Sequence, residues 1–87
     1  MEELNYRCPC CGYYTLGSEI GTYEICPVCF WEDDPHQRRN AMMAGGANEV
    51  SLIQARENFR SFGACEKRLI PYVRAPRQEE FSGIDAE

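Results

Sequence analysis

Apolar residues recur every three or four positions in the second half of the chain. They are Leu52, Ala55, Phe59 and Phe62. Residues at this spacing share one face of an α-helix. Ser51 with Gln54 has the pattern of an N-terminal capping box, and Gly63 is a natural left-handed stop. The pattern predicts a helix that begins after Ser51 and ends at Gly63.

Another helix is predicted in the middle of the chain. Asp34 is a suitable N-cap and Pro35 suits the first helical position. We expect this helix to continue to about Ala44 and to stop at the glycine pair 45–46. Residues 64–69 are expected to add one more short helical turn.

The first half of the chain has the pattern of short strands instead. Residues 13–16 and 22–25 are rich in aromatic and β-branched side chains and flank a glycine-containing turn at 17–21. We expect the two runs to pair as a β-hairpin.

Two Cys-x-x-Cys pairs, called knuckles below, flank this predicted hairpin. The first knuckle offers an ambiguity, since Cys10 and Cys11 are adjacent. Gly12 follows Cys11, and a glycine supplies the positive φ that the exit of such a turn requires, so Cys11 is the better ligand. Four thiols at this spacing can bind one tetrahedral metal. The predicted ligands are Cys8, Cys11, Cys26 and Cys29.

Zinc is the usual metal of a site with four cysteines. Because four protein ligands leave no open position for water, the metal is expected to stabilise the fold rather than to catalyse a reaction. Thiolates also accept iron, and Cys11-Gly12-Tyr13 followed by a Cys-Pro-x-Cys turn resembles the rubredoxin-like domain of rubrerythrins. The predicted fold class is α+β, a small metal-stapled zinc-ribbon or rubredoxin-like β-hairpin with two or three short helices.

A chain of 87 residues is expected to form one domain whose apolar core alone gives little stability. We expect the metal-binding domain to span residues 1–77. Within it, the knuckles and hairpin occupy 6–31 and the helical part 34–70. The remaining residues, 78–87, are polar and acidic and are expected to form a disordered tail.

Cys10 and Cys65 remain outside the predicted ligand set. A free cysteine commonly behaves as a small buried hydrophobic residue, which is the simpler interpretation for both. Cys10 could instead be a reactive extra thiol or a spare ligand. His36, the single histidine, could join Cys10 in a second metal site, although a surface or capping role is more common.

An aromatic and acidic segment follows the second knuckle directly. It consists of Trp31, Glu32, Asp33 and Asp34. In the structural interpretation, the tryptophan covers the metal site and the aspartates cap the next helix. Glu32 then pairs with Arg56, Arg60 or Arg74. In the functional one, the carboxylates bind a cation or act as acid and base in a small hydrolase. The structural interpretation is favoured, because neither a histidine nor a nucleophile with a recognisable partner stands beside the acids.

The formal net charge of −5 is concentrated at the two ends of the chain. The body carries no basic stripe of the kind found in nucleic-acid binders, so a nucleic-acid partner is not expected. No apolar run approaches the roughly 20 residues of a membrane helix. The N-terminus lacks the apolar run of a signal peptide. We therefore expect a cytoplasmic protein with reduced thiols and no membrane partner, whose oligomeric state stays open.

Several strings of residues carry a family resemblance. They are Cys8-Pro9-Cys10-Cys11-Gly12-Tyr13, the stretch 25–35, Gly45-Gly46-Ala47-Asn48 and much of 50–64. Together they resemble the bacterial cysteine-rich CPCC family, whose members look like small cytosolic proteins. The resemblance implies that the segment 31–34 and the loop 45–48 belong to the family pattern, which favours a functional surface there.

The preferred function is a structural zinc-binding domain that acts as a protein-interaction module. Its candidate surface comprises Trp31, Glu32, Asp33, Asp34, Asn48, Arg56 and Arg60. Two alternatives are a small hydrolase using the acidic segment and an iron-based electron carrier. Whether the domain is an enzyme stays open.

Overall fold

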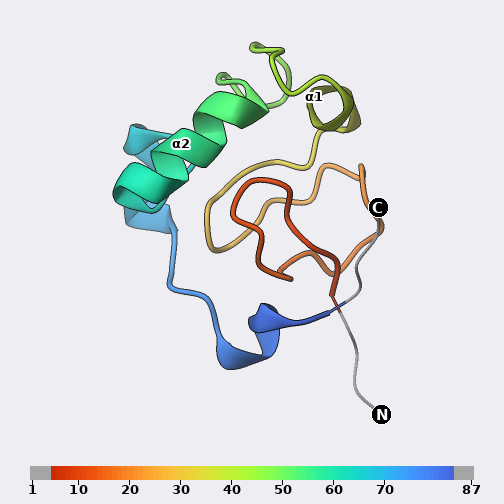
Figure 1. Cartoon of the computed structure of the whole chain (residues 1–87), viewed down its shortest axis with the longest axis vertical. Helices are drawn as coiled ribbons and strands as arrows, with labels where there is room; N and C mark the ends of the chain where they lie inside the picture. The colour runs from red at the N-terminus through yellow and green to blue at the C-terminus, as the bar shows by residue number, and fades with distance from the viewer. Residues whose placement is uncertain (1–4, 84–87) are drawn as a thin grey trace.

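The computed structural model describes residues 5–83 of the chain, and Figure 1 shows a fold built largely of loops. The helical elements in chain order are α1 (Pro35–Arg39), α2 (Leu52–Phe62) and the 3-10 helices η1 (Lys67–Tyr72) and η2 (Gln78–Phe81). Residues 5–83 contain no β-strand, only isolated antiparallel bridges between Tyr6 and Leu16 and between Ile25 and Glu32. The predicted α+β fold with a zinc-ribbon or rubredoxin-like hairpin is therefore wrong.

The predicted hairpin is absent because each β-prone run pairs across its own knuckle. Tyr6 and Leu16 exchange backbone hydrogen bonds of 2.7 and 3.1 Å on either side of the first knuckle. On either side of the second, the N–H of Asp33 donates to the carbonyl of Glu24 at 3.0 Å. A residue has one backbone donor and one acceptor, so Leu16 has no N–H left for a partner in the other run.

The loop between the two knuckles is held by carboxylates instead of by a ladder of backbone bonds. Glu24 accepts hydrogen bonds from the N–H groups of Gly17 and Ser18, at 2.9 and 2.7 Å. Asp33 accepts one from the N–H of Gly21 at 2.7 Å. These acidic side chains satisfy backbone donors of the loop 17–21.

Helix α1 begins where it was predicted but ends early. Asp34 is the N-cap and accepts from the N–H of His36 and Gln37, and Pro35 occupies the first turn. The helix ends at Arg39 because the following loop turns back around the buried side chain of Gln37. The amide of that side chain donates to the carbonyls of Met43, Asn48 and Val50, at 2.9 to 3.2 Å. A loop held in this way cannot continue the helix to residue 44.

Helix α2 has the predicted bounds. The Ser51 hydroxyl accepts from the N–H of Gln54, and Gly63 ends the helix with a left-handed φ of 83°. Leu52 and Ala55 are buried, while Phe59 and Phe62 are partly buried against the core. The apolar stripe thus faces inward, and the 3-10 helix η1 packs against α2 on the C-terminal side.

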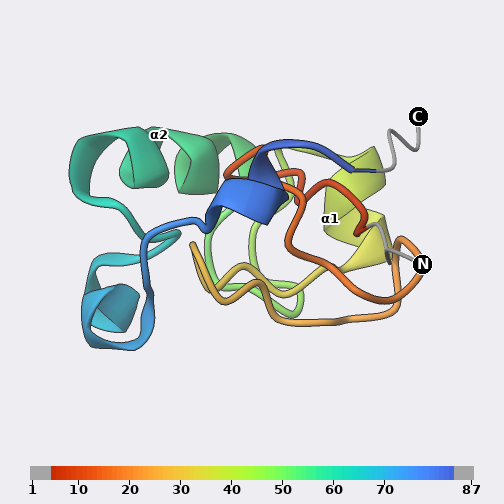
Figure 2. The same cartoon turned by 90° about the horizontal axis from the view of Figure 1, so that it is seen from below.

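The described part of the predicted tail is ordered against the body. Residues 78–81 form η2, and Glu80 is buried and paired with Arg74 at 2.7 Å. The backbone N–H of Tyr14 donates to the carbonyl of Glu80 at 2.8 Å, and Figure 2 shows η2 beside the N-terminal segment. Residues 78–83 therefore differ from the expected disordered tail, and residues 84–87 lie outside the described residues.

The core contains the cysteines of both knuckles together with Trp31, Leu16, Leu52 and Val28. Since these side chains come from loops and from one helix, the fold depends on the knuckles for its centre. None of the described helices is long and apolar enough to cross a membrane.

Candidate metal centre

The two knuckles have the same backbone hydrogen bonds. In the first, the N–H of Gly12 donates to the carbonyl of Cys8 at 2.9 Å. In the second, the N–H of Phe30 donates to the carbonyl of Cys26 at 2.7 Å. Both exit residues have a positive φ, 83° for Gly12 and 70° for Phe30. The second knuckle thus forces a non-glycine residue into the left-handed region, at a cost of roughly 1–2 kcal/mol.

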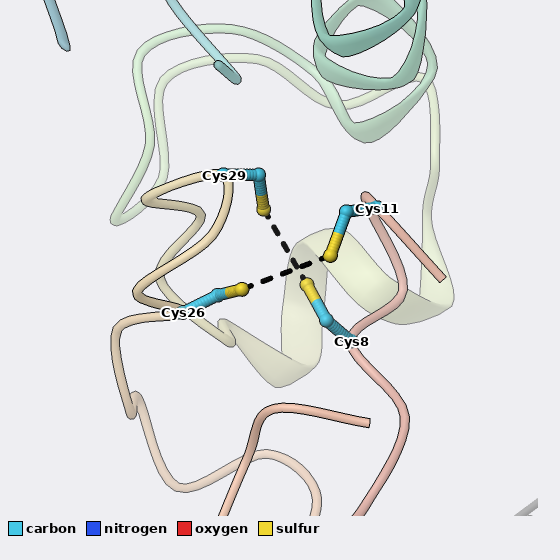
Figure 3. Close-up of side chains that lie close together, drawn as sticks. All are labelled: Cys8, Cys11, Cys26 and Cys29. Atoms are coloured by element: carbon cyan, nitrogen blue, oxygen red, sulfur yellow. Dashed lines mark hydrogen bonds between the residues drawn. The ribbon is translucent and has the colours of Figure 1, made fainter. Parts of the chain in front are cut away.

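The sulfur atoms of the predicted ligands converge on one point, as Figure 3 shows for Cys8, Cys11, Cys26 and Cys29. All four Sγ atoms lie within 4.8 Å of one another. The close contacts join the knuckles, with Cys8 Sγ 3.6 Å from Cys29 Sγ and Cys11 Sγ 3.7 Å from Cys26 Sγ. In a tetrahedral zinc–thiolate site with bonds of about 2.3 Å, sulfur atoms lie about 3.8 Å apart. The four cysteines therefore fit a single tetrahedral metal ion.

The ionisation of these thiols agrees with a cation site. Hydrogen bonds from the thiols of Cys11, Cys29 and Cys8 hold the pKa of Cys26 far below its ordinary value. The same bond to Cys26 raises the pKa of Cys11, and burial raises the pKa of Cys8 and Cys29. Without a cation the cluster thus favours one thiolate among four sulfurs. A divalent metal ion would stabilise all four thiolates, because its charge outweighs their mutual repulsion.

Two further groups lie against the Cys26 sulfur, and neither was predicted. The hydroxyl of Thr15 lies 2.9 Å from Cys26 Sγ, and the N–H of Val28 lies 3.4 Å from it. Donors of this kind orient a ligand sulfur and stabilise its thiolate. The N–H of a knuckle is expected from the motif, but Thr15 lies eleven positions away, and no sequence signal identifies it.

Cys10 and Cys65 are buried outside the ligand cluster. Cys10 is 7% exposed and belongs to the core, as does Cys65. Burial raises the pKa of Cys65 to about 12, and the charges of Cys10 and Glu66 add to this effect. A thiol with a raised pKa is a poor nucleophile, so Cys65 is a packing residue. Among residues 5–83, no metal-like cluster joins His36 to Cys10.

The candidate surface on the segment 31–34 is mostly inside the protein. Trp31 and Asp33 have no exposed area and Asp34 has 3%. Asp33 accepts from the N–H of Gly21 and from Nε of Arg38, at 2.7 and 3.2 Å. Burial works to raise the pKa of Asp34, but hydrogen bonds from the backbone of Ala47 and α1 outweigh it and lower this pKa. These side chains build the fold and are not available as a contact surface.

Asn48 is likewise a buried structural residue. Its side-chain carbonyl accepts from the N–H of Glu32 at 2.8 Å, and its amide donates to the Glu32 carbonyl at 2.8 Å. The same amide donates to Gln37 at 2.9 Å. Asn48 and Gln37 therefore hold the acidic segment in place from the loop 40–50. No feature of the sequence identifies Gln37 as a buried residue.

The arginines of the candidate surface remain exposed on α2. Arg56 donates from Nε to the carbonyl of Pro9 at 2.8 Å and so links α2 to the first knuckle. Arg60 lies 3.9 Å from Glu57, one turn away on the same helix. The predicted pairing of an arginine with Glu32 is not seen for Arg74, which binds Glu80 instead.

The model of a protein family described as cysteine-rich CPCC matches residues 6–80 of the chain. The match covers most of the 87 residues, so the chain belongs to this family, and the predicted resemblance is confirmed. The match ends at residue 80, within η2, in the part of the chain that was expected to form a disordered tail. No relative is found among the curated proteins.

Proposed function

We propose that this member of the cysteine-rich CPCC family is a zinc-stapled domain that acts as a protein-interaction module in the cytoplasm. The observation that carries the metal assignment is the convergence of four sulfur atoms within 4.8 Å. Four protein ligands close the coordination sphere, and such a closed site serves the fold. Metal binding to a set of this kind contributes directly to folding, which suits a small chain with a loop-built core.

Zinc is proposed over iron on chemical grounds. Both metals accept four thiolates in a tetrahedron, so the spacing of the sulfurs supports either. Zinc is the commoner partner of paired Cys-x-x-Cys knuckles. In the cytoplasm the thiols would stay reduced and available to the metal.

The proposed interaction surface is the outer side of α2 and the loop before it. Met42 is 75% exposed and Ile53 43% exposed. The N–H of Ile53 donates to the carbonyl of Ala41, which brings the loop next to the start of α2. Arg56 and Arg60 follow Ile53 at helical spacing. Exposed apolar side chains beside arginines are typical of protein-contact surfaces.

The hydrolase alternative gains no support from the acidic segment. Asp33 and Asp34 bind backbone N–H groups, Arg38 or both, and together they fasten α1 and the loop between the knuckles. Carboxylates used in this way have no free oxygen pair aimed at a substrate. The acids thus support the interaction surface from inside the fold.

Metal analysis tests the first half of the proposal. Native mass spectrometry of the purified chain should show one zinc ion per chain, and the protein should be colourless. A red protein with visible thiolate-to-iron absorption would show that the bound metal is iron and not zinc. This result would support an electron carrier. A metal-free chain that is fully folded would overturn the staple.

The surface is tested with the double variant I53D/R60E. We expect it to bind zinc like the wild type and to lose the partner that the wild type retains in pull-down experiments. The matched control is K67E, which changes an exposed charge on η1. Equal retention of the same partner by all three proteins would contradict this surface.

A further inference from the structure

A cavity of about 600 Å³ opens on the outer side of the first knuckle. Its walls come from the first knuckle, the loop between the knuckles, α1 and α2. The lining residues that matter here are Arg7, Pro9, Ile20, Arg38, Leu52 and Arg56. This volume lies in the range of small-molecule sites, roughly 300–1,000 Å³.

The cavity is not the metal position. Cys8 and Cys11 contribute to its wall, but Cys26 and Cys29 do not line it. A hollow between the four sulfurs would be lined by both knuckles, and it would hold only a single ion. The cavity therefore lies outside the metal site, with the first knuckle as its floor.

Three arginines from separate parts of the chain line this cavity. Arg7 precedes the first knuckle, Arg38 lies in α1 and Arg56 lies in α2. Among residues 5–83, none of those that line the cavity is acidic. In a chain of net charge −5, this is a local concentration of positive charge. Arginine matches the geometry of phosphate and carboxylate groups, because its planar fork donates two parallel hydrogen bonds.

Arg38 has an unsatisfied donor at this place. Its Nε lies 3.2 Å from Asp33 Oδ1, while its Nη2 is buried and has no hydrogen-bond partner within the described chain. A buried charged donor without a partner is energetically unfavourable, so a partner for this guanidinium is expected. A small rearrangement of the side chain, which is 23% exposed, would turn it toward an anion in the cavity.

Arg7 and Arg56 line the cavity, and each is held by a nearby group. Arg56 is anchored through Nε by the carbonyl of Pro9 at 2.8 Å. Arg7 lies over the ring of Tyr14, 5.3 Å from its centre. A side chain anchored in this way loses less conformational entropy when it binds an anion.

We infer that this cavity binds a small molecule that carries a phosphate or carboxylate group. The anionic group lies among the arginines, and an apolar remainder contacts Ile20, Leu52 and Pro9. This ligand site lies outside the proposed metal position, although Cys8 and Cys11 form part of its wall, and it shares Arg56 with the proposed protein-contact surface on α2. A charge-balancing role for the arginines is the competing explanation, because four thiolates with one divalent ion carry a net charge of −2.

The test uses the full chain loaded with zinc and three probes of similar size. They are phenyl phosphate, benzoate and the neutral benzyl alcohol. Calorimetry and NMR titration should show saturable binding of at least one anionic probe and none of benzyl alcohol. The two anions distinguish a phosphate-bearing ligand from a carboxylate. Amide shifts should concentrate at residues 7–12 and around 20, 38, 52 and 56.

Matched variants separate a built site from general charge. R56Q should weaken binding of the anion about tenfold, whereas R60Q, on the same helix but outside the cavity, should change it less than twofold. R38Q and R39Q form a second matched pair on α1. Arg38 lines the cavity, whereas Arg39, the last residue of α1, does not and serves as the control. Zinc content is measured for each variant, because all four should bind the metal.

Three results would overturn the inference. One is the absence of saturable anion binding to the wild type, which leaves charge balance as the role of the arginines. Another is equal weakening by R56Q and R60Q, which indicates a diffuse field. The third is equal binding of benzyl alcohol and the anions.

Discussion

The two knuckles share one pattern of backbone hydrogen bonds but differ in how the rest of the chain surrounds them. The second is enclosed: Cys26 and Cys29 have no exposed area, and the N–H of Cys65 donates to the Cys29 carbonyl at 2.8 Å. The first is open on one side, where Cys11 is only half-buried and an arginine-lined cavity begins. The same local motif therefore serves as the core in one half of the site and as an accessible floor in the other.

This difference shows that the candidate metal site is buried on the side of the second knuckle and accessible on the side of the first. The enclosed knuckle bonds to the carbonyl of Trp31, and the amides of Gln37 and Asn48 hold the segment that follows it through the backbone of Glu32. Arg56 from α2 donates to the open knuckle at Pro9, and Glu80 from η2 binds the segment that follows this knuckle at Tyr14. Changes on the enclosed side should act on folding, whereas changes on the open side should act first on access and binding.

The largest effect is expected from removing a metal ligand on either side. C26S and C11S should each lose the zinc and most of the cooperative unfolding transition, because metal binding to structural sites is worth about 10–16 kcal/mol in comparable small domains. Zinc content and thermal unfolding followed by circular dichroism measure this. C10S and C65S are the matched controls and should keep the metal. Loss of zinc in C10S would place that residue among the ligands.

A smaller effect is expected from the amide network behind the enclosed knuckle. Q37L should lower the free energy of unfolding by about 3 kcal/mol, because it leaves buried backbone carbonyls and the Asn48 side chain without partners. Denaturant unfolding of the zinc-loaded protein measures the change. Q54L on the exposed face of α2 is the control and should change stability little. Similar losses in the two variants would mean that the network contributes nothing specific.

The next effect concerns η2, which packs against the segment that follows the first knuckle. E80Q should destabilise the protein by about 2 kcal/mol near neutral pH, since Glu80 accepts charge-assisted hydrogen bonds from Arg74. Those bonds hold the pKa of Glu80 below its usual value, and burial opposes them only in part. A lowered pKa stabilises the folded state above the unfolded-state pKa, and this contribution disappears as the pH falls through the folded-state value.

The pH dependence separates this effect from metal loss. The stability difference between wild type and E80Q should be full near pH 7. It should begin to shrink below the unfolded-state pKa of about 4.3 and should disappear below the lowered folded-state pKa, where Glu80 is protonated in both states. Unfolding is measured for both proteins at each pH, together with zinc content. A difference that stays constant down to the lowest pH would contradict a role for the ionised carboxylate.

The smallest effect compares the two knuckle exits. G12A should cost about 1 kcal/mol, since a Cβ at Gly12 meets no atom within 4 Å and only the left-handed φ is strained. Phe30 already bears this strain and offsets it by stacking near Tyr72, with ring centres 5.6 Å apart. F30A should therefore destabilise through lost packing while the backbone stays unchanged. A stabilising F30A would show that the ring contributes less than expected.

Patterns that act over a few residues were predictable from the sequence. The bounds of α2 follow from its apolar spacing, the Ser51 cap and Gly63. The start of α1 follows from Asp34 and Pro35. The convergence of the four cysteines follows from their spacing, and the choice of Cys11 over Cys10 follows from Gly12. Each of these depends on the geometry of one turn or one helix, which a short stretch of sequence specifies.

The tertiary structure alone decided where backbone and polar side chains find their partners. Leu16 pairs with Tyr6 instead of with the second β-prone run. The hydrogen bonds of Gln37 end α1 early, and those of Glu80 hold η2 against the rest of the domain. The carboxylates of Asp33 and Asp34 bind hydrogen-bond donors inside the protein for the same reason. A carboxylate or amide binds whichever donor the fold brings near it, and that donor can come from any part of the chain. Composition and spacing therefore specify the metal site, whereas long-range contacts determine the fold around it and the cavity outside it.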